Sequence, residues 1–145
     1  MEKSLVIIKP DAIQRGLAST IIARLEDQGL KLVAIRMLHL DKALARRHYA
    51  VHKEKPFFSD LVDYISSAPI VAAVLEGEGS IAKIRKIMGA TDPAKAAAGT
   101  IRVDFGIDIE RNSVHGSDSA ETAEKEIKLF FSEDEIFSYR QEIGS

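Results

Sequence analysis

One stretch of this chain, Ile70-Val71-Ala72-Ala73-Val74-Leu75, is an unbroken apolar run closed by a turn at Gly77 and Gly79. A short apolar run bounded by turn residues predicts a strand buried on both faces, at the centre of a sheet. After the turn, Ser80 can cap a helix that ends at Gly89. The apolar face of that helix consists of Ile81, Ile84, Ile87 and Met88. The stretch therefore predicts a central strand followed by a helix.

Toward the N-terminus, strand and helix patterns alternate. Leu5–Ile8 is a short run rich in β-branched residues, and Lys31–Leu40 is apolar at alternating positions, so both predict strands. Three helices are predicted in this part of the chain. The first has Ala18, Ile21, Ile22 and Leu25 on one face and stops at Gly29. The second is capped by Asp41 and runs to about Ala50, and the third covers Phe57–Ile65.

Toward the C-terminus, Thr91–Arg102 predicts a loop with one helical turn, and Val114–Gly116 predicts a short strand. Asp118 and Glu121 have the spacing of a capping box, which predicts a helix to about Phe131. The order of elements indicates an α/β fold of the α+β sandwich kind: a ferredoxin-like, four-stranded, mainly antiparallel sheet with helices packed on it. No repeat or linker divides the chain, so we expect a single domain over residues 1–145.

Composition narrows the function classes. Apolar residues make up 46% and charged residues 29% of the 145, which is typical of an ordinary globular protein. The net charge of −2 gives no general attraction to polyanions, so nucleic acid is not an expected partner. The chain has no cysteine, which excludes disulfides and thiolate metal sites. The apolar runs are too short for a signal peptide or a membrane span, so we expect a cytoplasmic protein without membrane contact.

The segment Asn112-Ser113-Val114-His115-Gly116-Ser117-Asp118-Ser119 is rich in small polar residues just before a predicted helix. Backbone N–H groups and hydroxyls at a helix start can hold phosphate oxygens. A neutral imidazole can be a nucleophile that forms a covalent intermediate. The segment is therefore a candidate for a phosphate site with His115 as its nucleophile. The alternative is a helix cap with an incidental surface histidine.

A nucleophilic imidazole needs an acceptor on its other nitrogen. Glu124 and Glu126 lie on opposite edges of the buried stripe of the last helix, and the pattern does not choose between them. Lys9, Arg85 and Arg102 could converge to bind phosphates, or they could be separate surface charges.

Other residues give weaker signals. His48 and His52 are four apart, but no carboxylate motif accompanies them, so a metal pair is not the favoured interpretation. Phe57-Phe58 could form a platform for a base, although core packing is the default for such a pair. Gly77-x-Gly79 reads as a turn, and we find no Walker-type phosphate loop.

Several motifs, in order along nearly the whole chain, resemble the nucleoside diphosphate kinase family. The motifs are Ile8-Lys9-Pro10-Asp11, His48-Tyr49, Lys55-Pro56-Phe57-Phe58, Gly89-Ala90-Thr91-Asp92-Pro93, Gly99-Thr100-Ile101-Arg102 and Asn112…His115-Gly116-Ser117-Asp118-Ser119 followed by Glu126. The resemblance implies a ping-pong transfer of the γ-phosphoryl group from a nucleoside triphosphate to a nucleoside diphosphate, through a phosphohistidine at His115.

The resemblance also implies a role for each matching residue. Glu126, and not Glu124, would orient His115 with help from Ser117. Phosphate contacts would come from Lys9, Tyr49, Arg85, Thr91 and Arg102, ribose contacts from Lys9 and Asn112, and base contacts from Phe57, Leu61 and Ile109.

The family further implies Mg²⁺, bound mainly through the nucleotide phosphates and without metal-ligating side chains. It implies a homo-oligomer, either a hexamer or a tetramer. The alternative function is a non-catalytic nucleotide-sensing module of the same fold.

Overall fold

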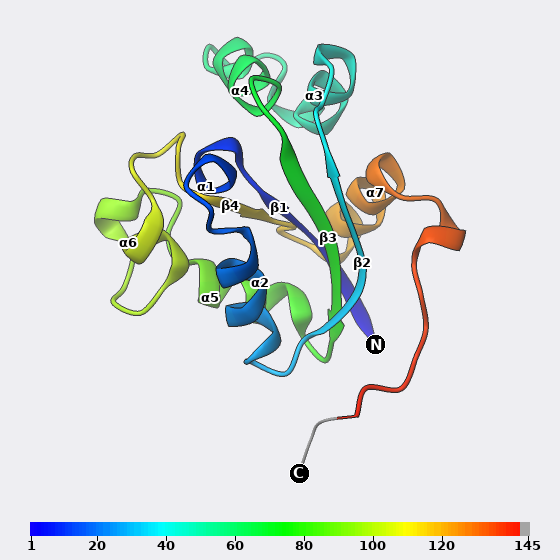
Figure 1. Ribbon diagram of the computed structural model, residues 1–145. Helices are drawn as coiled ribbons and strands as arrows, with labels where there is room; N and C mark the ends of the chain where they lie inside the picture. Colours follow the sequence, from blue (N-terminus) through cyan, green and yellow to red (C-terminus); the bar gives the residue numbers. More distant parts are fainter. Residues whose placement is uncertain (143–145) are drawn as a thin grey trace.

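The computed structural model describes residues 1–142, and their fold is built on a four-stranded sheet. Its strands are β1 (Glu2–Ile8), β2 (Lys31–Leu38), β3 (Ile70–Gly77) and β4 (Val114–Gly116), in the spatial order β2-β3-β1-β4 (Figure 1). All three neighbouring pairs are antiparallel. The structure thus confirms the predicted ferredoxin-like sheet and places β3 at its centre, as its apolar run predicts. The prediction of one domain over 1–145 extends past the described residues and stays a prediction.

Helices cover both faces of the sheet (Figure 1). They are α1 (Pro10–Gln14), α2 (Ala18–Glu26), α3 (Lys42–His48), α4 (Phe58–Ile65), α5 (Ser80–Met88), α6 (Ile101–Phe105) and α7 (Ala120–Phe130), with single turns of 3₁₀ helix η1 (Ala50–His52), η2 (Pro93–Lys95) and η3 (Glu133–Glu135). One core lies between the sheet and α3, α4 and α7, and the other between the sheet and α1, α2, α5 and α6. Among the described residues, no helix is both long and apolar enough to cross a membrane.

The two cores explain why β3 has no polar residue along its apolar run. Ile70, Ala72 and Val74 belong to the core with α3, α4 and α7. Val71, Ala73 and Leu75 alternate with them and belong to the other core. Because side chains of a strand point alternately to opposite faces, a strand covered on both sides must be apolar throughout.

Two helix starts differ from the predicted caps. Gly79, at a left-handed φ of 59°, is the N-cap of α5, and Ser80 instead donates its hydroxyl to the Glu2 carbonyl at 2.9 Å. The N-cap of α7 is Ser119, whose Oγ accepts from the Thr122 N–H at 3.1 Å, so the predicted capping box of Asp118 is wrong. In both places the N-cap lies one residue from the predicted position, at Gly79 instead of Ser80 and at Ser119 instead of Asp118. Other predicted signals are confirmed, since Asp41 caps α3 and α5 ends at Gly89.

Two short helices lie where the sequence pattern predicts none. Pro10 starts α1 immediately after Lys9, which fits the preference of proline for the first helical position. Thr100 caps α6, which continues beyond the predicted Thr91–Arg102 loop. Both helices have only five residues, too few for an apolar period to be visible. Strand β2 ends at Leu38, so the predicted strand to residue 40 is two residues too long.

Candidate active site

A cleft of about 790 Å³ lies beside β4, α3 and α7. Every residue predicted for the site lines it except Ser117, which is buried behind it. The lining set is Lys9, Tyr49, Phe57, Leu61, Arg85, Thr91, Arg102, Ile109, Asn112, His115 and Glu126. Residues from both ends of the described chain and from the segments between them therefore meet in one place. This convergence favours a joint role over scattered surface charges.

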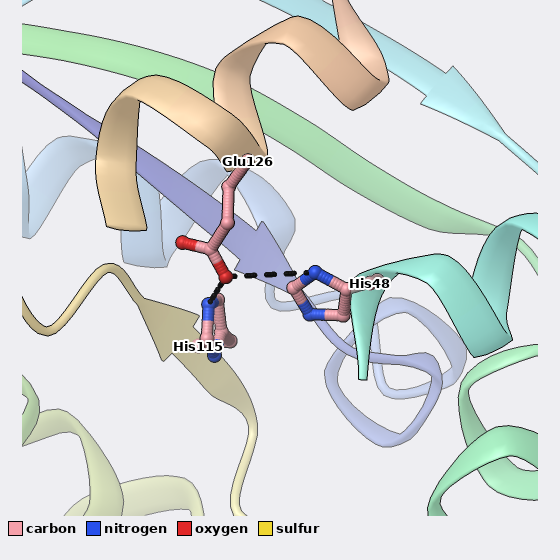
Figure 2. A group of neighbouring side chains, drawn as sticks. All are labelled: His48, His115 and Glu126. Carbon is pink, nitrogen blue, oxygen red and sulfur yellow. Dashed lines mark hydrogen bonds and ion pairs between the residues drawn. The ribbon is translucent and has the colours of Figure 1, made fainter. Parts of the chain in front are cut away.

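His115 on β4 is held by a carboxylate from α7 (Figure 2). Its Nε2 lies 2.8 Å from Glu126 Oε2. The other oxygen, Glu126 Oε1, accepts a hydrogen bond of 2.7 Å from the Ser117 hydroxyl, and Ser117 Oγ in turn accepts from the Leu5 N–H at 3.1 Å. With the carboxylate acting as acceptor, Nε2 carries the ring proton, and Nδ1 keeps a lone pair.

The structure distinguishes Glu126 from Glu124, which the pattern of the helix could not do. Glu126 is buried and contacts His115. Glu124 is exposed and lies 3.2 Å from Lys128, one turn along the surface of α7. A solvated pair of this kind contributes little to stability.

Local backbone geometry brings the histidine to the carboxylate. β4 pairs with β1 so that His115 lies opposite Ile7. Just before it, Ser113 adopts a left-handed φ of 75°, and its hydroxyl donates to Asp11 at 3.2 Å. At Gly116 a Cβ would lie only 2.9 Å from Ile84 of α5, so glycine allows this helix to approach the strand beside the cleft.

Burial and the neighbours shift the pKa values of this group. Burial alone would raise the pKa of Glu126, but the hydrogen bond and charge of His115, with His48 and the Ser117 hydroxyl, lower it below its ordinary value. Burial, with the charge of His115 next, lowers the pKa of His48 to about 3. The carboxylate is therefore ionised at neutral pH, and His48 is neutral.

Cationic side chains also line the cleft. Lys9 is buried, donates to Asn112 Oδ1 at 2.8 Å, and has a pKa lowered to about 8 by burial and by the charge of Arg102. Arg102 is also buried, donates to the carbonyls of Gly89 at 3.0 Å and Val114 at 2.7 Å, and has a pKa lowered to about 10 by burial and by Arg85. Arg85 is exposed on α5.

The remaining predicted residues define the polar wall and the mouth. Tyr49 is buried, and burial raises the pKa of its hydroxyl, so it stays protonated. Asn112 Nδ2 donates to the Thr91 carbonyl at 2.9 Å, which ties that loop to the strand. At the mouth, Phe57 is 45% and Ile109 63% exposed. These exposed apolar groups leave a surface suited to a flat ring.

The prediction from sequence missed one member of the central group. The His48 ring lies edge-on to His115 at 4.9 Å between ring centroids, and its Nδ1 is 3.5 Å from Glu126 Oε2. His48 directly precedes Tyr49 in one of the quoted motifs, and that adjacency was the available signal. His52, its suggested metal partner, lies instead beside Phe57, with 5.7 Å between ring centroids. Arg47, Asp118 and Lys125 also line the cleft and were not predicted.

A ferredoxin-like sheet with a histidine–carboxylate pair in a cleft lined by lysine and arginine defines a class, the α/β enzymes that act on phosphate-bearing substrates. Comparisons with known proteins narrow the class. A model of the nucleoside diphosphate kinase family matches residues 2–136.

Relatives named nucleoside diphosphate kinase share most of the chain. One from Dehalococcoides mccartyi (strain ATCC BAA-2266 / KCTC 15142 / 195) is 59% identical over 139 residues, which cover 96% of this chain and 98% of the relative. One from Methanothermobacter thermautotrophicus is 60% identical, covering 96% of this chain and 93% of the relative. The solved structure of a halophilic nucleoside diphosphate kinase from Halobacterium salinarum in complex with CDP matches with a TM-score of 0.94 and 46% identity, over 97% of this chain and 93% of that one. The chain therefore belongs to the nucleoside diphosphate kinase family, and it is a phosphotransferase.

Proposed function

We propose that this protein transfers the γ-phosphoryl group of a nucleoside triphosphate to a nucleoside diphosphate, by a ping-pong mechanism with a phosphohistidine at His115. The observation that carries the proposal is the 2.8 Å contact between His115 Nε2 and Glu126 Oε2 inside a cleft lined by cations. It leaves Nδ1 as the ring nitrogen available for attack.

Polar side chains of the cleft bind the phosphates in this proposal. Lys9, Arg85 and Arg102 supply positive charge, and Tyr49 and Thr91 supply hydroxyl donors. Charge-assisted hydrogen bonds to phosphate are stronger than neutral ones, and the buried position of Lys9 strengthens its electrostatic contribution. The ribose contact is assigned to Asn112, and its hydrogen bond from Lys9 supports this assignment.

In the first half-reaction, His115 Nδ1 attacks the γ-phosphorus. The N–P bond forms while the bond from the γ-phosphorus to the bridging oxygen breaks, and that electron pair leaves with the diphosphate. The Nε2 proton stays directed at Glu126, whose negative charge offsets the positive charge that develops on the ring. In the second half-reaction, a terminal oxygen of another diphosphate attacks the same phosphorus and the N–P bond breaks.

Mg²⁺ is proposed to arrive with the nucleotide. It prefers an octahedron of oxygen ligands, whereas the group of metal-ligating side chains in residues 1–142 has two imidazoles and one carboxylate, His48, His115 and Glu126. These side chains do not fit a resident magnesium ion. Bound to the phosphates, the ion supplies charge neutralisation.

The mouth of the cleft suits a base held by stacking. Phe57 and Ile109 are exposed there, with Leu61 one helical turn after Phe57. Stacking on an aromatic ring contributes roughly 1–3 kcal/mol per base and does not depend on the hydrogen-bonding edge. The protein is therefore expected to accept purine and pyrimidine nucleotides with modest preferences.

We also propose that the protein is a homo-oligomer, a hexamer or a tetramer. In support, Ile35 and Met37 are exposed apolar residues on β2, which is an edge strand of the sheet. Such an edge with apolar side chains favours contact with another chain.

The test is to incubate the protein with γ-labelled ATP and Mg²⁺ and to look for label on the chain. Wild-type protein should become labelled, the label should be labile to acid and stable to alkali, and added diphosphate should remove it as a triphosphate. His115→Ala should fold and remain unlabelled. Label on Ser117 or Ser119, or direct transfer without labelled protein, would contradict the proposal.

A further inference from the structure

We propose that His48, His115 and Glu126 form a binding site for a borderline-soft divalent cation of the Zn²⁺ class, and that the ion, once bound there, blocks the catalytic histidine. Metal binding itself does not depend on the proposed function, but its inhibitory effect does. The side chains come from three elements, α3, β4 and α7, and Figure 2 shows the carboxylate of Glu126 between the two rings.

The distances between the ligand atoms are close to those around a tetrahedral ion. Glu126 Oε2 lies 2.8 Å from His115 Nε2 and 3.5 Å from His48 Nδ1, and the three ligand atoms lie within 4.8 Å of one another. In a tetrahedral site with bonds of about 2.0–2.2 Å, ligand atoms lie about 3.3–3.6 Å apart. Seating an ion therefore requires side-chain rotations that move His115 Nε2 and Glu126 Oε2 apart to this spacing.

His48 provides an independent sign of a ligand. Its side chain is only 1% exposed, yet neither ring nitrogen has a hydrogen-bond partner among residues 1–142. A buried polar atom without a partner is costly, and native structures rarely keep one without a function. The Nδ1 atom is directed at the Glu126 carboxylate, and an ion between the two would satisfy it.

The surroundings support a metal as well. Glu126 Oε1 accepts from the Ser117 hydroxyl at 2.7 Å, which fixes the orientation of the carboxylate in the way that outer partners orient metal ligands. All three side chains line the cleft, which has room for water as a fourth ligand.

The ligand types select the metal. Two imidazoles and one carboxylate are a common set for Zn²⁺ and related ions. Mg²⁺ prefers oxygen ligands and keeps much of its water, so the magnesium that accompanies nucleotides does not compete for this site.

Zn²⁺ binding and phosphoryl transfer exclude each other, because both use His115. When the ion takes the electron pair of Nε2, the ring proton moves to Nδ1, and Nδ1 then has no lone pair for attack on the phosphorus. The Glu126 carboxylate is also bound to the metal and no longer accepts a proton from the ring. Zn²⁺ should therefore slow the labelling of His115.

The first experiment measures Zn²⁺ binding to the full chain without nucleotide, by competition with a chromophoric chelator. We expect one tight site per chain. His48→Gln should weaken it by at least about 10-fold, since even the loss of an outer partner of a metal ligand costs about 10–100-fold. His52→Gln is the matched control, because His52 lines the same cleft but lies outside the proposed ligand group. The Zn²⁺ affinity of this variant should equal that of the wild type. Equal affinity in His48→Gln, or no tight binding by the wild type, would overturn the proposal.

A measurement on the wild type avoids any folding defect of the buried His48 variant. In ¹H–¹⁵N spectra of the histidine rings, Zn²⁺ should shift Nδ1 of His48 and Nε2 of His115, and should leave His39 and His52 unchanged. Shifts confined to His39 or His52 would refute the site. Labelling by γ-labelled ATP after incubation with Zn²⁺ then tests the inhibition. If the metal binds as described but the metal-free protein never becomes labelled, the proposed function fails while the metal site stands. If metal-bound protein is labelled at the full rate, the blocking role fails.

Discussion

At the scale of the single residue, the chemistry of His115 is determined by which of its nitrogens is occupied. Glu126 lies at Nε2, and the Ser117 hydroxyl and the Leu5 N–H fix the carboxylate from behind. The acceptor therefore cannot turn away without breaking its hydrogen bond from Ser117, and the Leu5 N–H holds Ser117 in place. A rigid acceptor holds the ring in one orientation, which keeps Nδ1 directed into the cleft before the nucleotide arrives.

Replacing Glu126 by Gln should lower kcat by about tenfold or more and change nucleotide affinity much less. The amide can still accept from Nε2, but it carries no charge, and a hydrogen bond to a charged acceptor is about twice as strong as a neutral one. Steady-state kinetics at several nucleotide concentrations separate kcat from KM. Glu124→Gln is the matched control on the same helix and should behave like the wild type, since Glu124 is exposed and forms a surface ion pair with Lys128. Equal effects of the two substitutions would refute the positioning role of Glu126.

The ammonium group of Lys9 should produce an alkaline limit of activity. Burial, with the charge of Arg102, lowers its pKa to about 8 in the free protein, so its positive charge is present below that pH and is lost above it. Hence kcat/KM, which reports the free enzyme, should fall by up to about tenfold per pH unit above about pH 8. Bound phosphate favours the charged form, so kcat should begin to fall at a higher pH. A kcat/KM that stays flat well above pH 8 would show that Lys9 does not bind the phosphates in its charged form.

The contrast between Glu124 and Glu126 also marks the limit of prediction at this scale. Their angular positions on the helix are equivalent with respect to its buried stripe, so periodicity alone could not choose. What distinguishes them is the position of β4, and that position depends on the pairing of Val6–Ile8 with Val114–Gly116 more than one hundred residues apart. The family resemblance selected Glu126 before the structure did. It did not assign His48, whose burial against His115 depends on how the end of α3 packs.

At the scale of the element, the start of α7 helps to position the carboxylate of Glu126. Ser119 Oγ accepts from the Thr122 N–H at 3.1 Å and satisfies one of the free donors of the first turn. Glu126 follows two turns later on the same helix. The orientation of the helix start therefore contributes to where the carboxylate meets His115.

Substitution of Ser119 by Ala should lower the free energy of unfolding by about 1 kcal/mol, the usual effect of losing an N-cap hydroxyl. The measurement is urea unfolding at one fixed protein concentration, because assembly would make stability depend on concentration. Asp118→Asn is the control. Asp118 was the cap expected from the sequence, but it is exposed and lies outside the helix, so its change should cost less than about 0.5 kcal/mol. A larger effect at Asp118 than at Ser119 would restore the predicted capping box.

A helix or strand could be predicted from the sequence when it was long enough to show its own pattern of apolar residues. Strand β3 and the amphipathic helices α2 and α5 extend over eight or nine residues, and their positions were confirmed. Cap positions shifted by one residue, since serine, aspartate and glycine next to one another all suit an N-cap. The five-residue helices α1 and α6 were missed because contacts with the rest of the protein, and not a local pattern, hold them.

At the scale of the whole molecule, the sheet brings distant parts of the chain to one cleft. Lys9 follows the end of β1, His115 lies on the neighbouring β4, and Glu126 comes from the helix that covers β1. The loop between α5 and α6 adds Thr91 and leads to Arg102, and it is tied to the site through Asn112. Only the complete sheet order places these groups together, so the site is a property of the whole fold.

The outer edge of the same sheet should support assembly. Within residues 1–142, β2 pairs with β3 alone, and Ile35 and Met37 on it are 52% and 63% exposed. The segment after η3 runs beside the first half of this strand. The Phe137 N–H donates to the Val33 carbonyl at 2.9 Å, and Tyr139 contacts Lys31 and Leu32. The part of β2 beyond these contacts keeps an edge with apolar side chains, which can pair with another chain.

Met37→Glu should therefore shift the protein toward smaller species. Burial of a methionine side chain contributes roughly 1.5–3 kcal/mol, so introducing a charge there should weaken each such contact by about tenfold or more. Light scattering coupled to size-exclusion chromatography gives the mass at several protein concentrations. Val51→Glu is the matched control, because Val51 is 83% exposed on η1 and lies away from β2. If Met37→Glu keeps the wild-type mass down to the lowest concentration while remaining folded, the edge of β2 does not hold the oligomer together, and assembly must use another surface.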